Sequence, residues 1–458
     1  MTRSIALLLM LLAAAASAAP DSPPETALAD YVAAPDPSFE WRVHARYSAP
    51  AAEVVELRLH SQTWRGALWK HQLFLIKPDD LGADVDRGLL VIGGGRWREQ
   101  YETEAPAELP EDAELFIGMA AALDTVVAVL GQVPFQPLFG MNEDELIAFT
   151  FDRYLESGDA EWPLLLPMVK SAVRAMDAAQ AFAAEQWRVA LDEFTVLGGS
   201  KRGWTTWLTG AVDSRAAVLV PVVIDALNFA AHMPYQTAVW GAPSRMLAPY
   251  TERGLHEVLG AEGGEDLRTI VDPYSYRQRL TQPKLVVVAT NDEYFPLDAL
   301  NLYWDELEEP KHVLYLPNDE HSIEDFARLI PALAAVHRAG AGDAALPDVA
   351  WEFEERAALR LCVRAAPAPA AVHAWVADSA DGDFRDSQFL ARAMTPSADG
   401  FILDLDPPAA GFSAAFAEVV FGAGEARYSL STNVRVVGAA GRARHEATAI
   451  RGERGVCP

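Results

Sequence analysis

The spacing of apolar and polar residues divides this chain into a long region of strands and helices and a shorter region of strands. Residues 54–64 and 68–76 alternate between apolar and polar positions, which predicts two half-buried strands in an antiparallel hairpin. Continuous apolar runs predict strands buried on both faces, at 88–92, 125–130, 194–197, 217–224, 284–290 and 313–316. A helical period predicts helices at 115–123, 143–154, 164–186, 203–212 and 322–338. This alternation predicts a doubly wound, mainly parallel α/β sheet, whose ligands bind at the carboxyl ends of its strands.

Two segments interrupt or follow this pattern. Residues 229–282 contain many aromatic residues and no long apolar strand, which predicts an irregular helical insertion that covers the site as a lid. Small residues and proline at 339–347 predict a linker, and short strands between turns then predict a small all-β sandwich. We therefore expect a signal peptide at 1–18, an α/β domain at 25–340, a β-sandwich domain at 348–437 and a loosely ordered tail at 438–458.

Charge and the N-terminal residues set the expected location. The 458-residue chain carries a formal net charge of −28, which favours solubility and cationic ligands and disfavours nucleic acid and anionic membranes. An apolar run from Ile5 to Ala16 precedes a small-x-small site that ends at Ala18, and the run is shorter than a membrane span. These features predict cleavage after Ala18 and a periplasmic or secreted protein without a stable membrane anchor.

Cysteine usage agrees with export but leaves two states open. Cys362 and Cys457 are the two cysteines of the chain, so one disulfide is permitted, and two buried free thiols are the alternative. We expect no metal, because the chain has neither His-Glu-x-x-His nor paired Cys-x-x-Cys motifs. No dinucleotide fingerprint occurs either, so no cofactor is expected.

The candidate nucleophile is Ser200. An apolar run from Phe194 meets Gly198 and Gly199, and after the serine a helical pattern begins around Trp204. A serine at such a strand–turn–helix junction is held clear of its neighbours, and the helix amides stabilise negative charge beside it. Taken alone, the same serine would more often be a helix N-cap.

A serine nucleophile needs a base and an orienting acid. In α/β hydrolases these follow in the order serine, acid, histidine. Asp292 comes directly after the strand at 284–290, and His321 follows the strand at 313–316. Asp225, Glu293 and Asp319 are rival acids, of which Asp225 is the most serious because it ends the strand next after the nucleophile.

An oxyanion hole would complete the site. The backbone N–H of Lys201 is one candidate donor, and Gly94 and Gly95 are the candidates from the glycine-rich loop after the strand at 88–92. Arg202 occupies the position where the Gly-x-Ser-x-Gly pattern has glycine. The positive charges of Lys201 and Arg202 could bind a substrate carboxylate, and the equal alternative is that both side chains are solvated on the first turn of the helix. The candidate substrate contacts are Arg202, Asn228, Tyr235 and Trp240.

Several segments resemble one family closely. They include Gly-Gly-Ser-Lys-Arg-Gly-Trp and its continuation at 198–213, together with 92–95, 167–177, 221–228, 290–295 and 317–322. They are similar to the PhoPQ-activated pathogenicity-related proteins, over about residues 28 to 385. The resemblance implies an exported protein with an α/β-hydrolase-like fold and a C-terminal β domain, and the family's name implies a place in envelope stress and virulence.

Three functions follow as hypotheses. The first is an exported serine hydrolase that acts on peptides or amides, with cationic peptides as substrates that the acidic surface would attract. The second is a carboxylesterase that acts on carbohydrate or small acyl esters through the same triad. The third is a catalytically silent protein that binds cationic peptides in the envelope.

Overall fold

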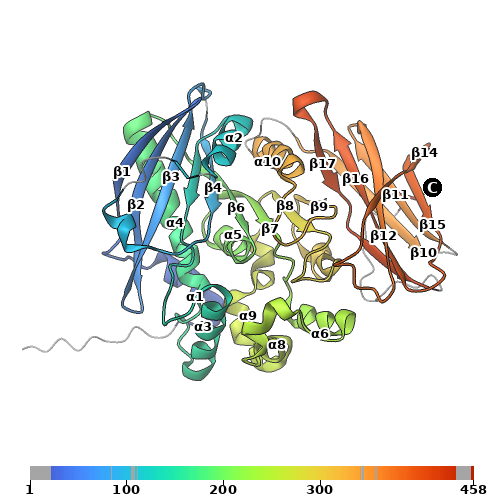
Figure 1. Ribbon diagram of the computed structural model, residues 1–458, viewed down its shortest axis with the longest axis horizontal. Coiled ribbons are helices and arrows are strands. Elements are labelled where there is room, and N and C mark those ends of the chain that lie inside the picture. Colours follow the sequence, from blue (N-terminus) through green and yellow to red (C-terminus); the bar gives the residue numbers. More distant parts are fainter. Residues whose placement is uncertain are drawn as a thin grey trace, which may run out of the picture.

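A long mixed sheet runs through the whole molecule in the computed structural model (Figure 1). The structure describes residues 22–83, 85–104, 109–110, 112–340, 342, 345–355, 358–439 and 455–457. The predicted signal peptide lies outside these ranges, as does most of the predicted tail. Within the described residues, no helix combines the length and the apolar composition that a membrane crossing requires.

The centre of the sheet is parallel, as the continuous apolar runs predict. Its strand order is β5-β4-β6-β7-β8-β9, and all neighbouring pairs in this stretch are parallel. Nearly every side chain of these strands is buried, because helices cover both faces. The strands are β4 (Arg87–Ile92), β5 (Val127–Leu130), β6 (Glu193–Gly199), β7 (Ala216–Val222), β8 (Lys284–Ala289) and β9 (Lys311–Leu316).

The first flank of the sheet is antiparallel. The predicted hairpin is present as β2 (Ala52–Trp64) and β3 (Ala67–Pro78), and β3 pairs with β5. Outside it lies an edge strand that the pattern did not predict, β1 (Glu40–Ala49), whose side chains are mostly exposed or half-buried. Because an exposed edge strand buries neither face, its sequence carries no strong apolar alternation.

Helices pack on the two faces of the sheet. Helices α4 and α5 cover one face and α2 and α10 the other (Figure 1), so the expected doubly wound arrangement is present. The helices of this part are α1 (Pro24–Ala33), α2 (Ala113–Leu123), α3 (Glu143–Ser157), α4 (Leu165–Phe182), α5 (Lys201–Val212) and α10 (Phe326–Gly340). Helix α10 begins four residues later than predicted, because the carboxylate of Asp319 accepts hydrogen bonds from the backbone N–H groups of Glu324 and Asp325 and holds that segment as a loop.

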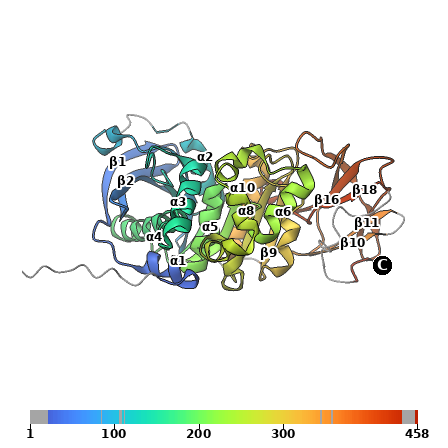
Figure 2. The same ribbon diagram turned by 90° about the horizontal axis from the view of Figure 1, so that it is seen from below.

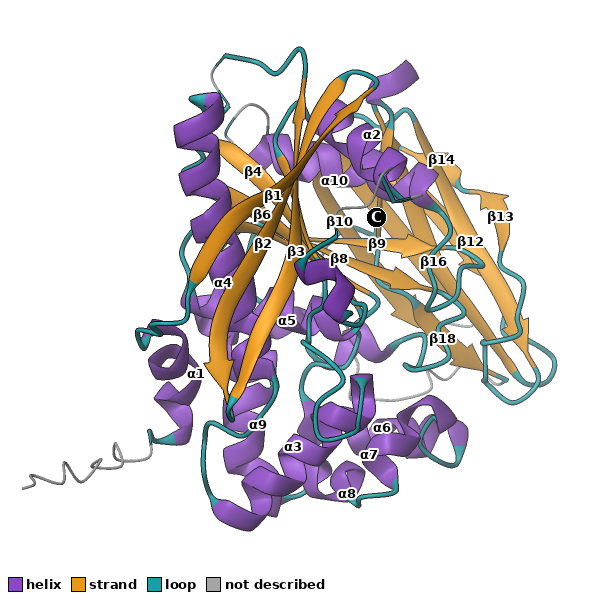
Figure 3. Cartoon of the chain, turned by 60° about the vertical axis from the view of Figure 1, so that its left-hand side comes forward, coloured by secondary structure: helices purple, strands orange, loops and turns teal. Residues whose placement is uncertain are grey.

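The aromatic-rich insertion is a set of short helices at one end of the sheet. These are α6 (Phe229–Trp240), α7 (Ala248–Thr251), α8 (Leu255–Gly260) and α9 (Glu265–Val271). Figure 3 shows them gathered with α3 beyond one end of the sheet, and Figure 2 shows α3, α6 and α8 from that side. The insertion begins at the carboxyl end of β7, which is the neighbour of β6, so it starts at the end of the sheet where the candidate nucleophile lies.

The C-terminal strands form two antiparallel sheets, and one of them continues the central sheet. Strands β12 (Ala371–Ser379), β13 (Leu390–Ala393), β16 (Phe412–Phe421), β17 (Tyr428–Ser431) and β18 (Arg435–Gly438) extend it through the pairing of Ser431 with Val313 of β9. Strands β10 (Asp348–Glu355), β11 (Leu359–Ala366), β14 (Thr395–Ser397) and β15 (Gly400–Leu405) form the other. An all-β region of two antiparallel sheets is therefore present after the predicted linker, and β17 joins it edge to edge to the α/β sheet.

A disulfide holds the end of the chain to this region. Cys362 of β11 is bonded to Cys457, and the carboxylate of Glu352 accepts hydrogen bonds from the backbone N–H groups of 455–457. Of the two cysteine states that the sequence left open, the structure has the disulfide.

Candidate active site

The turn between β6 and α5 holds Ser200 in a strained backbone conformation. Its φ of 56° and ψ of −127° are rarely adopted by a residue with a side chain, and such strain is typical of a nucleophile at a sharp strand-to-helix turn. The backbone N–H of Ser200 donates to Val222 O, and Trp204 N donates to Ser200 O. These bonds fix the turn from the neighbouring strand and from the helix, so the hydroxyl is presented at the carboxyl end of the sheet.

Two glycines let the helix pass close to the strands at this turn. A Cβ on Gly198 would lie 2.4 Å from Arg202 O, and a Cβ on Gly203 would lie 2.8 Å from Gly198 O. Gly203 thus provides the close approach that the Gly-x-Ser-x-Gly pattern assigns to the position of Arg202. The departure from the pattern moves the required glycine by one residue and leaves the turn intact.

The structure brings Ser200, His321 and Asp292 together. The Ser200 Oγ lies 2.8 Å from His321 Nε2, and His321 Nδ1 lies 2.9 Å from Asp292 Oδ2. The second carboxylate oxygen of Asp292 accepts a hydrogen bond from Tyr294 N at 2.7 Å. Burial raises the pKa of Asp292 above its ordinary value, and the hydrogen bond from His321 opposes this shift. The three side chains have the connectivity of a nucleophile, a base and a group that orients the base.

Asp225, the main rival acid, is placed elsewhere. Its side chain is 4% exposed and accepts a hydrogen bond from Tyr303 Oη at 2.8 Å. Burial raises the pKa of Asp225 to about 8, against the opposing effect of the Tyr303 hydrogen bond. Asp225 is therefore protonated at neutral pH. Of the other rivals, Glu293 accepts a hydrogen bond from His321 N, and Asp319 caps the segment before α10.

The pKa of Asp225 predicts a change of stability with pH. The unfolded carboxyl group loses its proton near pH 4, whereas the folded group keeps it to about pH 8, so the folded state binds the extra proton between these values. The stabilisation is therefore full below pH 4 and is lost as the pH rises to 8. We expect Asp225→Asn, which mimics the protonated group, to be more stable relative to the wild type at pH 9 than at pH 6 in urea unfolding. An equal difference at both values would contradict the assignment.

Lys201 and Arg202, the two cations after the nucleophile, are engaged with carboxylates of α3. Lys201 Nζ lies 3.2 Å from Glu143 and 3.0 Å from Asp144, and an Arg202 guanidinium nitrogen lies 2.8 Å from Glu143. Although burial alone would raise the pKa of Glu143, Arg202 and Lys201 lower it to about 2. The charges expected for a substrate carboxylate are therefore already neutralised within the protein.

Arg202 also connects the nucleophile turn to the glycine loop after β4. Its Nε donates to Val133 O at 2.6 Å, and a Cβ on Gly94 would lie 2.5 Å from its guanidinium group. Gly95 has a φ of +105°, and its carbonyl accepts from the Gln136 side chain at 3.0 Å. The Gly94–Gly95 loop is thus packed against Arg202. Lys201 is the first residue of α5, so its backbone N–H lies directly after the nucleophile and has no partner within the helix.

The other candidate substrate contacts do not line the pocket beside Ser200. The Asn228 side chain donates to Leu302 O at 3.0 Å, and Tyr235 is 6% exposed. Trp240 stacks on Arg385, whose guanidinium carbon lies 4.4 Å from its ring centre. Their assignment as substrate contacts stays a prediction.

Tyr294 is a site residue that the sequence did not single out. Its ring centre lies 4.0 Å from that of His321, with an angle of 31° between the planes, and Tyr294 also lines the pocket beside Ser200. Stacking on Tyr294 fixes the plane of the imidazole ring, and the hydrogen bond to Asp292 fixes the direction of Nδ1. The position of Tyr294 two residues after the acid is the one local signal that could have indicated it.

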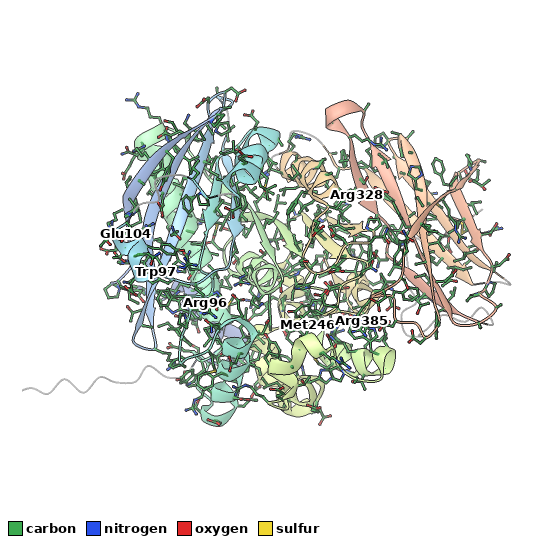
Figure 4. The ribbon with its side chains drawn as sticks, in the orientation of Figure 1. Arg96, Trp97, Glu104, Met246, Arg328 and Arg385 are labelled. Carbon is green, nitrogen blue, oxygen red and sulfur yellow. A yellow bond between two sulfur atoms is a disulfide. The ribbon has the colours of Figure 1, made fainter. Side chains whose placement is uncertain are left out.

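Two asparagines tie the acid and base loops to the C-terminal strands. The Asn291 side-chain amide donates to the carbonyls of Phe384, Arg385 and Ser387 at 3.3, 2.9 and 2.8 Å. Asn318 exchanges hydrogen bonds with the backbone of Phe389. Figure 4 shows Arg385 where the C-terminal strands meet the helical insertion. The connection between β12 and β13 is therefore bonded to both loops that carry the triad.

The bonds of Asn291 to the β12–β13 connection predict that this distant part of the chain positions the triad. We expect Asn291→Ala to lower kcat by about ten- to a hundred-fold with a smaller change in KM, because displacement of the Asp292 loop by about 1 Å would spoil the triad geometry. Asn301→Ala is the matched control, since the Asn301 side chain also donates to the C-terminal region, to Val434 O between β17 and β18, but lies in the short helix Ala299–Leu302 and not next to a triad residue in the sequence. Equal losses in the two variants would instead indicate general destabilisation.

Comparison with solved structures finds similarity to esterases. An acetyl xylan esterase from Paenibacillus sp. R4 has a TM-score of 0.47 at 14% identity, with 69% of this chain and 92% of that chain covered. A glucuronoyl esterase from Solibacter usitatus has a TM-score of 0.40 at 14% identity, with 69% and 92% covered.

Sequence comparison gives a closer relationship. Autocrine proliferation repressor protein A from Dictyostelium discoideum is 32% identical over 312 residues, which are 65% of this chain and 61% of that protein. The chain thus spans less than two thirds of the length of this relative. Residues 28–385 match the family described as PhoPQ-activated pathogenicity-related protein, the same span over which the motifs resemble it. The chain belongs to the PhoPQ-activated pathogenicity-related protein family.

Proposed function

We propose that this protein is a serine hydrolase with Ser200 as nucleophile, His321 as general base and acid, and Asp292 as the group that orients His321. The observation that carries this proposal is the continuous pair of hydrogen bonds from Ser200 Oγ through His321 to Asp292, at 2.8 and 2.9 Å. The strained backbone of Ser200 supports it independently, because a helix cap does not require a φ of 56°.

The reaction follows from the placement of these groups. The Ser200 Oγ attacks the substrate carbonyl carbon while its proton passes to His321 Nε2. The oxyanion that develops accepts hydrogen bonds from the backbone N–H of Lys201 and from the Gly94–Gly95 loop. Return of the proton from His321 expels the alcohol or amine, which leaves an acyl group on Ser200. Water, deprotonated by His321, then releases the acid and restores the serine.

Two substrate classes are compatible with this chemistry. A carboxylic ester is favoured by the pocket beside Ser200, because its walls are mainly apolar. A basic peptide is favoured by the net charge of −28, which would concentrate cationic substrates near the surface. Because carboxylates of α3 neutralise Lys201 and Arg202, these two cations do not favour a substrate carboxylate or an acidic peptide.

A panel of esters and basic peptides tests the proposal. We expect the wild-type protein to hydrolyse members of at least one class and Ser200→Ala to hydrolyse neither. Peptide cleavage without ester cleavage would establish a peptidase. Binding of the peptides by a folded wild-type protein that cleaves nothing would overturn the proposal and favour the silent binding protein.

Export is part of the proposal. The apolar N-terminal run with its small-x-small site supports a cleaved signal, and the disulfide between Cys362 and Cys457 suits an oxidising compartment. Fractionation of cells that express the full chain tests this, with N-terminal sequencing of the product. We expect an N-terminus at Ala19 in the periplasm or medium, and an intact Met1 in the cytoplasm would contradict it.

A further inference from the structure

A small apolar pocket lies directly beside Ser200. Its volume is about 60 Å³, and Ser200 itself forms part of its wall. The nucleophile turn contributes Trp204, the loop of the triad acid contributes Tyr294 and Phe295, and the helical insertion contributes Phe229, Met233 and Leu259. The insertion is therefore more than a cover over the site, because it forms one wall of the space next to the nucleophile.

The walls of the pocket are apolar and well packed. Phe229, Met233 and Leu259 are 4%, 8% and 3% exposed. The lining also includes Lys201 and Asp144, which lie 3.0 Å apart and neutralise one another, Tyr250, whose hydroxyl donates to Asp144, and His256, whose pKa is lowered by burial. A charged group placed among the apolar side chains of Phe229, Met233 and Leu259 would lose its hydration, whereas a hydrocarbon group would be stabilised by burial. The pocket is thus suited to an uncharged aliphatic group.

The size of the pocket limits the length of that group. A cavity of about 150 Å³ accepts benzene, and a water molecule has a share of about 30 Å³ in the liquid. A pocket of about 60 Å³ therefore holds on the order of two to four non-hydrogen atoms. Longer chains would have to displace the buried side chains of the wall, which close-packed interiors resist, or extend beyond the pocket, where less of their surface is buried.

We propose that this pocket binds the acyl part of the substrate, and that the protein is selective for esters of short, uncharged aliphatic acids of two to four carbons. This rests on the proposed function, because the pocket becomes an acyl site only if Ser200 attacks the ester carbonyl. In the first step, the bond from Ser200 Oγ to the acyl carbon forms and the bond to the alcohol oxygen breaks, and the alcohol takes the proton from His321. The short acyl chain then lies between the insertion and Phe295 until water attacks and the acid departs.

The proposal predicts a sharp dependence on acyl length. We expect kcat/KM for p-nitrophenyl esters to be highest between acetate and butanoate and to fall at least ten-fold by octanoate. Leu259→Ala should enlarge the pocket and move the optimum to longer chains, with the octanoate-to-acetate ratio raised at least ten-fold. Leu329→Ala is the matched control, because Leu329 is also a buried leucine, 3% exposed, but lies in α10 and not in the pocket. Its length profile should equal that of the wild type.

The possible outcomes separate this inference from the proposed function. Hydrolysis that depends on Ser200 but shows no preference for short acyl chains, or an optimum that Leu259→Ala leaves unchanged, would overturn the acyl pocket and leave the serine hydrolase standing. An equal shift in Leu329→Ala would also overturn it, because the effect would then be one of stability. Absence of any ester hydrolysis by the folded protein would overturn the pocket assignment, and the peptide panel would then decide the proposed function.

Discussion

Replacement of Ser200 with alanine is expected to lower kcat by about 10⁴- to 10⁶-fold, because the acyl-enzyme pathway requires the hydroxyl oxygen and no nearby group replaces it. KM should change little, since the pocket and the proposed oxyanion donors remain. The measurement is steady-state hydrolysis of the best ester or peptide from the panel. A loss smaller than ten-fold would show that the nucleophile lies elsewhere.

The strain at Ser200 provides a control for this variant. Ser200→Gly should be as inactive as Ser200→Ala, but glycine adopts a φ of 56° without penalty. We therefore expect Ser200→Gly to have a free energy of unfolding about 1 to 2 kcal/mol higher than that of Ser200→Ala. Inactive variants that differ in stability in this direction would show that activity was lost through chemistry and not through unfolding.

Replacement of Asp292 with asparagine is the second change with a large expected effect. An asparagine that keeps its oxygen on Tyr294 N would present its NH2 group, a donor, to His321 Nδ1, so His321 would lose the tautomer and orientation that the reaction requires. We expect kcat to fall by about 10⁴-fold, with little change in the free energy of unfolding. Steady-state kinetics and urea unfolding of the same preparation measure both quantities.

Asp225→Asn is the matched control for this carboxylate. Both side chains are buried acids near the carboxyl ends of neighbouring strands, but Asp225 is bonded to Tyr303 and its raised pKa keeps it protonated at neutral pH. We expect Asp225→Asn to retain kcat within a few-fold of the wild type. A large loss in Asp225→Asn together with an active Asp292→Asn would reverse the assignment of the triad acid.

The amino-acid pattern predicts the centre of this fold well because that centre is repetitive. Fully buried parallel strands require continuous apolar runs, and covering helices require a helical period, so β4 to β9 and most of their helices can be found without a structure. Edge strands such as β1 and β13 have few buried side chains and so leave no such pattern. The pairing of β17 with β9 depends on segments more than a hundred residues apart, and no local pattern records it.

Some features of the candidate site could also be predicted from the sequence, and others could not. Ser200, Asp292 and His321 each follow a predicted strand, so their approach to one another follows from the topology. The placement of Asp292 after its strand favoured it over Asp225, but the sequence does not show which side chain reaches the imidazole. The sequence also could not reveal that Glu143 and Asp144 neutralise the cations after the nucleophile, since α3 is separated from them by about sixty residues.

The C-terminal strands are bonded directly to the candidate active site. A separate β domain joined by a linker would leave the catalytic part independent, whereas Asn291 and Asn318 bond the β12–β13 connection to both triad loops. We infer that the C-terminal strands serve the geometry of the active site. The kinetic comparison of Asn291→Ala with Asn301→Ala tests this directly.

The central claim is that Ser200 is a nucleophile activated by His321, and covalent modification tests it most directly. The folded protein is treated with a fluorophosphonate, the adduct is counted by intact-protein mass spectrometry, and the modified residue is located by peptide sequencing. The account predicts one adduct per chain, on Ser200, that is absent from Ser200→Ala and strongly reduced in His321→Ala. No adduct on the folded wild-type protein, or an adduct on another residue, would contradict it.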